Sequence, residues 1–212
     1  MKKGLILLLV LLPALSVAAI DRGIGADVDL TGRTYKEDAS RATSTQVSLM
    51  PAVVMKMSPQ VEIRPYAVIG FDSEKDPDAI IGAIQDDYSA FNFGLGGGLY
   101  YTLIQRELIS VLIGPKLELL FYARPSGASS TYDRYFRAII EVALPIYMDV
   151  MLKENLFLRG GLEIPGLVLN LWSYEQGGVK YVDNHTSFAD FYDAGPVLYL
   201  GFYYMFKGAG SS

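Results

Sequence analysis

The residues near the end of the chain, 191–206, alternate in size with a period of two, and this pattern constrains the fold more than any other segment. Large apolar side chains share one phase, and smaller or more polar residues such as Val197, Tyr199 and Gly201 occupy the other. Side chains alternate between the two faces of a β-strand. The segment therefore predicts a strand with one apolar face that ends in aromatic rings. Aromatic residues beside an apolar band are typical of strands that cross a bilayer, because amphipathic rings settle at the headgroup level.

The rest of the chain is apolar without being helical in pattern. Hydrophobic residues make up 51% of it, and it holds 15 Tyr and 10 Phe. After residue 19, no apolar run approaches the roughly 20 residues that a transmembrane helix needs. Alternating membrane strands produce this combination. The net charge of −5 leaves no broad basic surface, so nucleic acid is not an expected partner.

The amino terminus has the layout of a secretory signal peptide. Lys2 and Lys3 precede an apolar stretch over 5–12, and small residues over 16–19 form a cleavage site. The chain contains no cysteine, which excludes a disulfide framework, a thiolate metal site and a lipid anchor on cysteine. We therefore predict a signal peptide over 1–19, one barrel domain over 20–206 and a short flexible tail over 207–212.

Eight strands are predicted, an even number as in single-chain bacterial barrels. They span 23–32, 45–57, 61–72, 88–102, 108–123, 134–151, 156–174 and 191–206. Tight polar turns at 58–60, 105–107 and 153–155 alternate with long polar loops at 34–44, 73–87, 125–133 and 175–190. Short turns at one end and long loops at the other are typical of membrane barrels. The predicted fold is all-β: an eight-stranded antiparallel up-and-down transmembrane β-barrel with periplasmic termini, closed by pairing of 191–206 with 23–32.

Charged residues fall on the glycine-bearing face of the predicted strands, opposite the aliphatic residues. The set that we expect in the lumen is Glu62, Arg64, Lys116, Glu118, Arg137, Glu141, Arg159 and Glu163. A barrel of eight strands has room inside for side chains and little else. The favoured interpretation is a mutually neutralising network that fills the lumen, and the alternative is a polar conduction path. Glycines over 94–98 are expected to make room for bulky lumen side chains.

Six prolines, at 51, 65, 115, 145, 165 and 196, fall inside the predicted strands. Proline cannot donate to a strand ladder, so each is expected to need a bulge or a local gap.

Together, the signal peptide, the alternating loops and the aromatic last strand resemble the small eight-stranded outer-membrane proteins of the OmpA, OmpX and OmpW type. The resemblance covers almost the whole mature chain and rests on pattern. It implies that Phe202, Tyr204 and Phe206 form a carboxy-terminal assembly signal read by the barrel-assembly machinery. Here residues 207–212 follow the last aromatic, whereas the usual signal ends at it.

Two loops contain residues with weaker chemical indications. Asp72, Glu74, Asp76 and Asp78 belong to an acidic outer loop, and alternating oxygen ligands of this kind can hold calcium. The run lacks the turn glycine and the twelfth-position glutamate of an EF-hand, so a solvated loop without metal is favoured. His185 is the only histidine. Since some small outer-membrane barrels modify lipids, His185 and Ser187, with Asp190 or Asp193, are weak candidates for a catalytic triad.

The favoured function is a non-enzymatic, integral bacterial outer-membrane protein that passes small or hydrophobic solutes in the OmpW-like manner. Three alternatives stay open: a closed barrel that acts as an adhesin or anchor through its loops, a lipid acyl-transfer or deacylase enzyme using His185, and a soluble periplasmic lipocalin-like barrel. The expected partners are outer-membrane lipid, the barrel-assembly machinery, and a small hydrophobic solute or host surface ligand. No cofactor is expected.

Overall fold

The computed structural model describes residues 21–37, 40–75, 88–123, 126–127, 134–188 and 197–206. They form one antiparallel sheet with the strands β1 (Asp21–Glu37), β2 (Ser40–Ser58), β3 (Val61–Lys75), β4 (Tyr88–Gln105), β5 (Ile109–Ile113), β6 (Lys116–Tyr122), β7 (Ser126–Gly127), β8 (Arg134–Lys153), β9 (Leu156–Gln176), β10 (Val179–Phe188) and β11 (Val197–Phe206). The described residues contain no helix that is long and apolar enough to cross a membrane. The predicted signal peptide and tail lie outside these residues.

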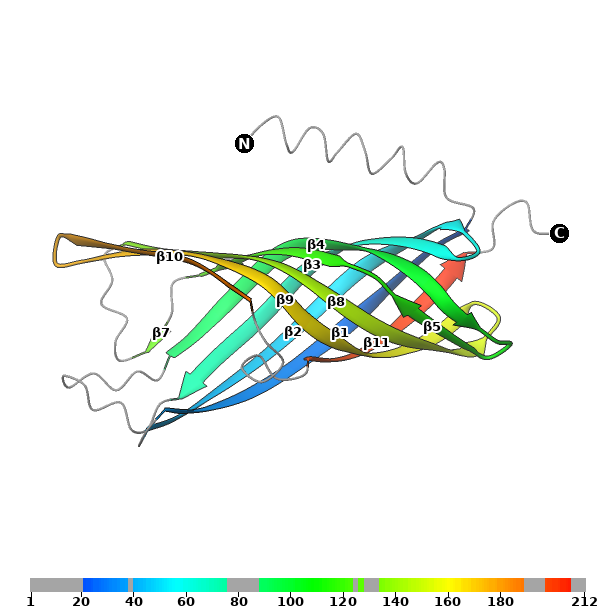
Figure 1. Cartoon of the computed structure of the whole chain (residues 1–212), viewed down its shortest axis with the longest axis horizontal. Helices are drawn as coiled ribbons and strands as arrows, with labels where there is room; N and C mark the ends of the chain where they lie inside the picture. The colour runs from blue at the N-terminus through cyan, green and yellow to red at the C-terminus, as the bar shows by residue number, and fades with distance from the viewer. Residues whose placement is uncertain are drawn as a thin grey trace, which may run out of the picture.

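The sheet closes into a ring because β11 pairs with both the first and the ninth strand (Figure 1). The register with β1 runs from Arg22↔Phe206 to Leu30↔Leu198. Eight strand positions, which we call staves, make up the ring. They are β1, β2, β3, β4, β5 together with β6, β8, β9 and β11. The predicted fold class and the predicted closing pair are therefore confirmed.

The two ends of the barrel differ in their connections. Turns at 59–60, 106–108 and 154–155 lie at the same end as Asp21 and Phe206, which we call the short-turn end (Figure 1). The opposite end, which we call the long-loop end, carries the connections after β1, β3, β6 and β10. This separation of short and long connections is the one that the sequence predicts.

The fifth predicted strand, 108–123, is wrong as a single element, because it divides at Gly114–Pro115 into β5 and β6. Proline has no amide proton to give to a ladder. The Pro115 carbonyl still accepts a hydrogen bond from the Leu99 amide at 3.1 Å. Both pieces pair with β4 and with β8, so the break leaves the stave in place.

All four predicted loops are wrong in part, because strands continue into three of them at the long-loop end and the two-residue β7 lies in the fourth, 125–133. β1 and β2 pair as far as Glu37↔Ser40, and β3 continues to Lys75. The predicted loop over 175–190 contains β10, which forms a hairpin with β9 around Gly177 and Gly178. Both glycines have positive φ, as a tight hairpin turn requires. Polar strands give no hydrophobic alternation, so sequence pattern alone does not reveal these extensions.

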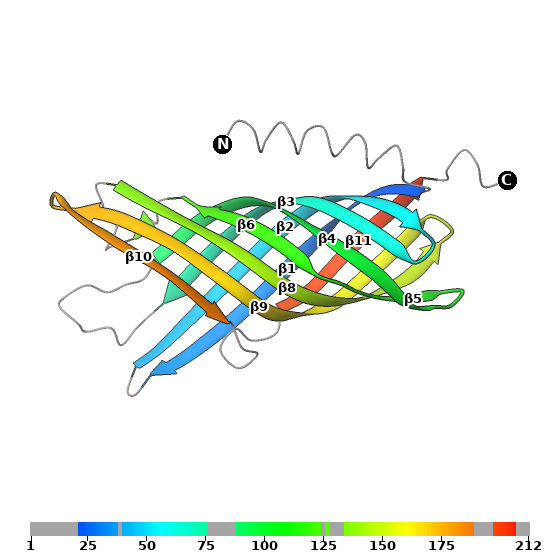
Figure 2. The ribbon, with the colours of Figure 1, turned by 45° about the horizontal axis from the view of Figure 1, so that its top comes forward.

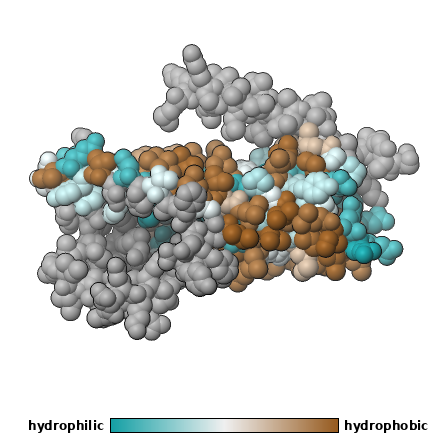
Figure 3. All heavy atoms as spheres, viewed as in Figure 1, coloured by the Kyte–Doolittle hydropathy of each residue, from teal (hydrophilic) through white to brown (hydrophobic). Residues whose placement is uncertain are grey.

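Apolar side chains cover the outside of the barrel, and charges lie within it. Along β11 the odd-numbered residues are buried, while Leu198, Leu200, Phe202, Tyr204 and Phe206 are exposed. Figure 3 shows the resulting apolar surface, with hydrophilic residues at its short-turn end. Arg64, Lys116 and Arg159 are nearly inaccessible. A soluble lipocalin-like barrel would have the reverse arrangement, so this alternative is contradicted. The surface is that of a barrel that spans a lipid bilayer.

The prolines are accommodated in different ways. Pro51 of β2 and Pro65 of β3 fall in two interruptions of the β2–β3 ladder, the first from Leu49↔Ile69 to Ala52↔Tyr66 and the second from there to Met55↔Ile63, without a change of register. At Pro165 the register of β9 against β8 shifts, and Gly166 is the extra residue of a bulge. Pro145 keeps a ladder partner, Glu163, with no shift at that point. Pro196 lies outside the described residues.

Two adjacent glycines of β9 provide a test of the packing. A Cβ on Gly161 would overlap the Tyr147 ring inside the barrel, whereas a Cβ on Gly160 would meet nothing within 4 Å. We expect Gly161→Ala to lower the free energy of unfolding by about 1–3 kcal/mol, because the closed ring cannot yield to the added methyl group. Gly160→Ala is the matched control and should be neutral or slightly stabilising. Urea unfolding in lipid vesicles, followed by heat-modifiable gel mobility, measures both; equal effects would contradict the packing.

Candidate functional site

Two arginines from different strands meet in the lumen among three tyrosines, and we call these five residues the arginine–tyrosine layer. The Arg64 guanidinium carbon lies 4.8 Å from the ring centroids of Tyr100 and Tyr203 and 5.2 Å from that of Tyr147. The Arg159 guanidinium lies 4.9 Å from Tyr147 and 4.5 Å from Tyr203. Both arginines are 1% exposed. Such desolvated cation–π contacts are favourable, and they fill the cross-section of the barrel with side chains.

Carboxylates neutralise this layer. Glu62 accepts hydrogen bonds from Arg64, with 3.1 Å to its Nε. Asp149 accepts two bonds of 2.5 Å from Arg159, one from Nε and one from Nη2. Asp27 Oδ2 lies 3.8 Å from Arg64 Nη1, and it also accepts a hydrogen bond from the Tyr203 hydroxyl. Bidentate and shared contacts of this kind compensate the cost of burying charge.

A second cluster surrounds Lys116, and we call it the lysine cluster. Lys116 Nζ lies 2.6 Å from Glu163 Oε2 and 3.4 Å from Glu118 Oε2. It donates to the Tyr199 hydroxyl at 2.8 Å, and that hydroxyl donates to Glu163 at 2.5 Å. Tyr66 donates to Glu118 at 2.9 Å. Each charge in the cluster therefore has at least two partners within the lumen.

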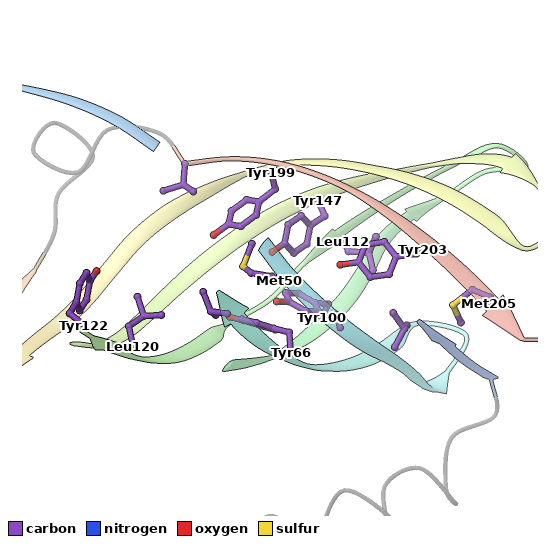
Figure 4. Packing of buried hydrophobic residues seen from close by; sticks show 14 of the residues in the cluster. Met50, Tyr66, Tyr100, Leu112, Leu120, Tyr122, Tyr147, Tyr199, Tyr203 and Met205 are labelled. Carbon is purple, nitrogen blue, oxygen red and sulfur yellow. The ribbon is translucent and has the colours of Figure 1, made fainter. Parts of the chain in front are cut away.

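Glycines on the neighbouring strands provide the space for these tyrosines. Gly96 is the ladder partner of Tyr66, and a Cβ there would overlap the ring. Gly25 stands in the same relation to Tyr203. Figure 4 shows Tyr66, Tyr100, Tyr147, Tyr199 and Tyr203 gathered within the barrel. The alternation of glycine and tyrosine on the inward phase therefore packs the lumen, and the prediction for the glycines at 96 and 98 is confirmed.

At the short-turn end, little space remains inside the ring. The pocket there is bounded by Lys56, Glu62, Asp149 and Arg159, among others, and its volume is about 30 Å³. A volume of this size admits a few water molecules at most. The arginine–tyrosine layer thus occludes the lumen at this end.

Towards the long-loop end, the inward residues become apolar and then polar again. Met50, Val68 and Leu120 are buried there, and Ile139 packs against the same cluster. Beyond them lie Asn92, Tyr122, Arg137 and Trp172, which occupy successive positions in the ladder. Figure 4 shows Leu120 and Tyr122 on the long-loop side of the other tyrosines.

The barrel wall changes its pairing at β9. Residues Leu156 to Glu163 of this strand pair with β11, whereas Leu167 to Gln176 pair with β10. The Gly166 bulge lies between these two segments. On the other side of β11, the register with β1 ends at Leu30, and among the described residues β1 continues paired with β2 alone. In Figures 1 and 2 the β9–β10 hairpin and the β1–β2 hairpin point away from each other at the long-loop end.

The eight predicted lumen residues are distributed unequally. Glu62, Arg64 and Arg159 meet in one cluster, and Lys116, Glu118 and Glu163 meet in the other. Arg137 lies apart, with its guanidinium 4.6 Å from the Tyr122 ring. Glu141 is the ladder partner of Glu118.

The predicted lumen set omitted residues that complete both clusters: Asp27, Asp149, Tyr66, Tyr100, Tyr147, Tyr199 and Tyr203. Each lies in the inward phase of its strand. That phase, together with a glycine on the neighbouring strand, is the signal that would have found the tyrosines.

The candidates for metal binding and catalysis are not brought together by the described residues. Asp72 is buried within β3 and does not belong to a loop, so its assignment to an acidic outer loop is wrong. Glu74 is also part of β3, while Asp76 and Asp78 lie outside the described residues. No group of three potential metal ligands occurs in the part of the chain that the structure describes. His185 and Ser187 lie on β10, opposite Asn170 and Val168 in the ladder; Asp190 and Asp193 lie outside the described residues.

The fold and the sidedness define a class: a small antiparallel transmembrane β-barrel. Solved structures agree. The chain is similar to the outer membrane protein OprG from Pseudomonas aeruginosa, with a TM-score of 0.60 and 14% identity over 89% of this chain and 96% of that one. A major outer membrane protein from Thermus thermophilus matches with a TM-score of 0.42 and 14% identity over 88% of this chain and 98% of that one. Ail of Yersinia pestis matches with a TM-score of 0.33 and 11% identity over 88% of this chain and 97% of that one.

Of these three, only the likeness to OprG exceeds a TM-score of 0.5, and at its level of identity it establishes the fold alone. The chain has the fold of the small outer-membrane barrels, so the predicted resemblance is confirmed at that level. The sequence matches no protein-family model and no curated protein.

The arginine–tyrosine layer makes a prediction about stability. Arg64→Met removes the cation between Glu62 and Asp27 and leaves both carboxylates buried. Breaking a buried ion pair from one side costs about 3–5 kcal/mol. Arg106→Met, on an exposed turn at the short-turn end, is the control and should change stability by less than about 0.5 kcal/mol. Urea midpoints in detergent measure both, and similar midpoints for the two variants would mean that the layer does not stabilise the barrel.

Proposed function

We propose that the protein is a non-enzymatic, integral outer-membrane barrel that takes up small hydrophobic solutes at its long-loop end and releases them sideways into the membrane. The observation that carries this proposal is the occlusion of the lumen by the arginine–tyrosine layer. A solute that reaches the apolar side chains around Leu120 has no axial route past Arg64 and Arg159, whose guanidinium groups are packed between rings.

A sideways route is favoured by the change of pairing along β9. A closed barrel normally satisfies every backbone group through its two neighbours. Here the β11 ladder ends at Val197↔Glu163 on one side and at Leu30↔Leu198 on the other. Above this level, the described parts of β1 and β10 have no ladder between them. Towards the long-loop end, β9 exchanges β11 for β10, and this exchange supports a sideways route at the level of the apolar lumen.

The cellular setting is part of the proposal. The apolar exterior fits outer-membrane lipid, and the signal-like amino terminus fits export, with both termini on the periplasmic side. Phe202, Tyr204 and Phe206 lie on the lipid face of the closing strand, 54%, 46% and 47% exposed. This placement is compatible with recognition by the barrel-assembly machinery.

One further observation favours a second role in surface binding. The β9–β10 hairpin projects beyond the other strands at the long-loop end (Figure 1). Tyr174 and Tyr181 stack across it with ring centroids 4.7 Å apart, and Tyr181 is 45% exposed. A closed barrel acting as an adhesin would present this hairpin to a host ligand.

Two measurements on vesicles of outer-membrane lipid separate these roles. Planar-bilayer recording should show little ion conductance, because the axial path is occluded. Vesicles containing the barrel should nevertheless accelerate transfer of a fluorescent hydrophobic probe into their lipid. A barrel that conducts ions freely, or that leaves probe transfer at the rate of empty vesicles, would contradict the proposal and favour an open pore or loop-borne binding respectively.

The apolar part of the lumen provides a matched pair of variants. Leu120→Gln places an amide where Leu120 and Ile139 now pack, so a hydrophobic solute would meet an unpaired polar group. We expect probe transfer to fall by about tenfold, the change that roughly 1.4 kcal/mol produces. Leu120→Met conserves volume and polarity, and transfer should remain within about twofold of the original. Equal rates for the two variants would place the route elsewhere.

A further inference from the structure

Seven inward positions form one continuous ladder row that winds obliquely around the barrel towards the long-loop end. Going from strand to strand, each residue is the ladder partner of the next, and we call this set the outer polar row: Asp29, Ser48, Gly70, Asn92, Tyr122, Arg137 and Trp172. The row two residues closer to the short-turn end contains Val68, Leu120 and Ile139. That lower row also contains Asp27 and Asn170 at its two ends, so the apolar residues lie beside the middle of the outer polar row.

Asn92 is the exceptional member of this row. It is 0% exposed, while its neighbours Phe91 and Phe93 face lipid at 50% and 51% exposure. Its amide therefore points into the lumen. Among the described residues, neither its Oδ1 nor its Nδ2 has a hydrogen-bond partner. Gly70 makes room for this amide, because a Cβ there would run into Asn92 Oδ1 and Ser48 Oγ.

Trp172 Nε1 and Asn170 Oδ1 are further buried polar atoms at or near the row in the ladder. Trp172 Nε1 belongs to the row itself, and Asn170 Oδ1 is one row below it, beside Ile139. Within the described structure neither has a hydrogen-bond partner. Buried polar groups are nearly always paired in folded proteins. Small-molecule sites combine an apolar lining with a few placed polar groups, and Asn92 beside Leu120 and Val68 has this composition.

The charged residues at this level are already engaged. Asp29, Asp72 and Arg137 each have an interaction partner, and the Arg137 guanidinium lies over the Tyr122 ring. A charged ligand would lose its hydration here and would have to displace these contacts to gain an opposite charge. The neutral Asn92 amide is matched by a neutral ligand group that both donates and accepts hydrogen bonds.

We propose that the outer polar row selects small uncharged molecules that combine an apolar body with a single hydroxyl or amide group. The Asn92 Oδ1 accepts a hydrogen bond from that group and Nδ2 donates one to it, while the body lies on Leu120, Val68 and Ile139. The inference rests on the proposed route through the lumen and specifies which solutes use it. A site that hydrogen-bonds a ligand hydroxyl rejects the analogue that lacks it far more strongly than an apolar pocket rejects one methyl group.

Trp172 gives a direct measurement, because it is the only tryptophan in the chain and lies in the row. The probes are cyclohexanol and methylcyclohexane, which have similar size and differ in a hydroxyl against a methyl group. Each is titrated into the full-length barrel in detergent, and Trp172 fluorescence reports binding. Comparing proteins at the same detergent concentration removes the partition of each probe into micelles.

Asn92→Leu should weaken cyclohexanol binding by about tenfold, the effect of one lost hydrogen bond at its upper range. Methylcyclohexane binding should stay within about twofold. Asn155→Leu, in a turn at the short-turn end, is the control and should change neither. If Asn92→Leu lacks heat-modifiable mobility, Asn92→Ser replaces it, with the same selective loss expected. Equal loss for both probes, no loss for either, or no binding to the original protein would overturn the proposal.

Transfer of the two probes into vesicle lipid separates this inference from the proposed function. Rapid transfer of both probes with no effect of Asn92→Leu would retain the route and refute the selection by Asn92. Selective binding without any accelerated transfer would retain the site and refute the route.

Discussion

The closure of the ring by β11 is the interaction on which the rest of the structure depends. Lipid offers no partner to a backbone amide or carbonyl, so a sheet can span a bilayer only when its two edges meet. The nine ladder pairs from Arg22↔Phe206 to Leu30↔Leu198 provide this closure. Once the edges have met, the inside and outside are fixed by the period of two. Every charged residue on the inward face, where Asp27 and Tyr203 lie, must then be accommodated in a narrow lumen. Every residue on the outward face, where Leu200 lies, faces lipid.

That geometry explains why the lumen is packed rather than open. A ring of eight strands leaves a cross-section about one layer of side chains wide. Arginine and tyrosine fill it well, because a planar guanidinium stacks on rings while its edge binds carboxylates. The arrangement needs small residues at positions such as Gly25 and Gly96, where larger ones would collide with the rings. Paired charges, packed aromatic rings and small glycine residues therefore fill the lumen together.

Strands with a repeating hydrophobic pattern could be predicted from the sequence, whereas strands that are defined by pairing with a partner could not. Hydrophobic alternation located all eight staves, because the lipid face imposes it directly. It did not reveal β10 or the outer part of β1, since these segments lack a regular alternation of apolar and polar residues and are defined by pairing with a partner strand. Pairing of charges was equally hidden. Arg64 and Arg159 are 95 positions apart in number, and no local pattern indicates that Glu62 lies within reach of both.

The exchange of partners along β9 links the wall to the lumen. β9 pairs with β11 towards the short-turn end and with β10 towards the long-loop end, so it bends between the two segments. The Gly166 bulge provides this bend directly after Pro165, which has no amide proton to donate to the ladder. Gly166 is suited to this position, since a Cβ there would collide with the Val142 carbonyl oxygen. Val168 follows it in the inward phase, opposite Glu141. The bulge therefore lies where the charged clusters give way to the apolar lumen. The irregularity in the wall and the change in lumen chemistry coincide, as a lateral route requires.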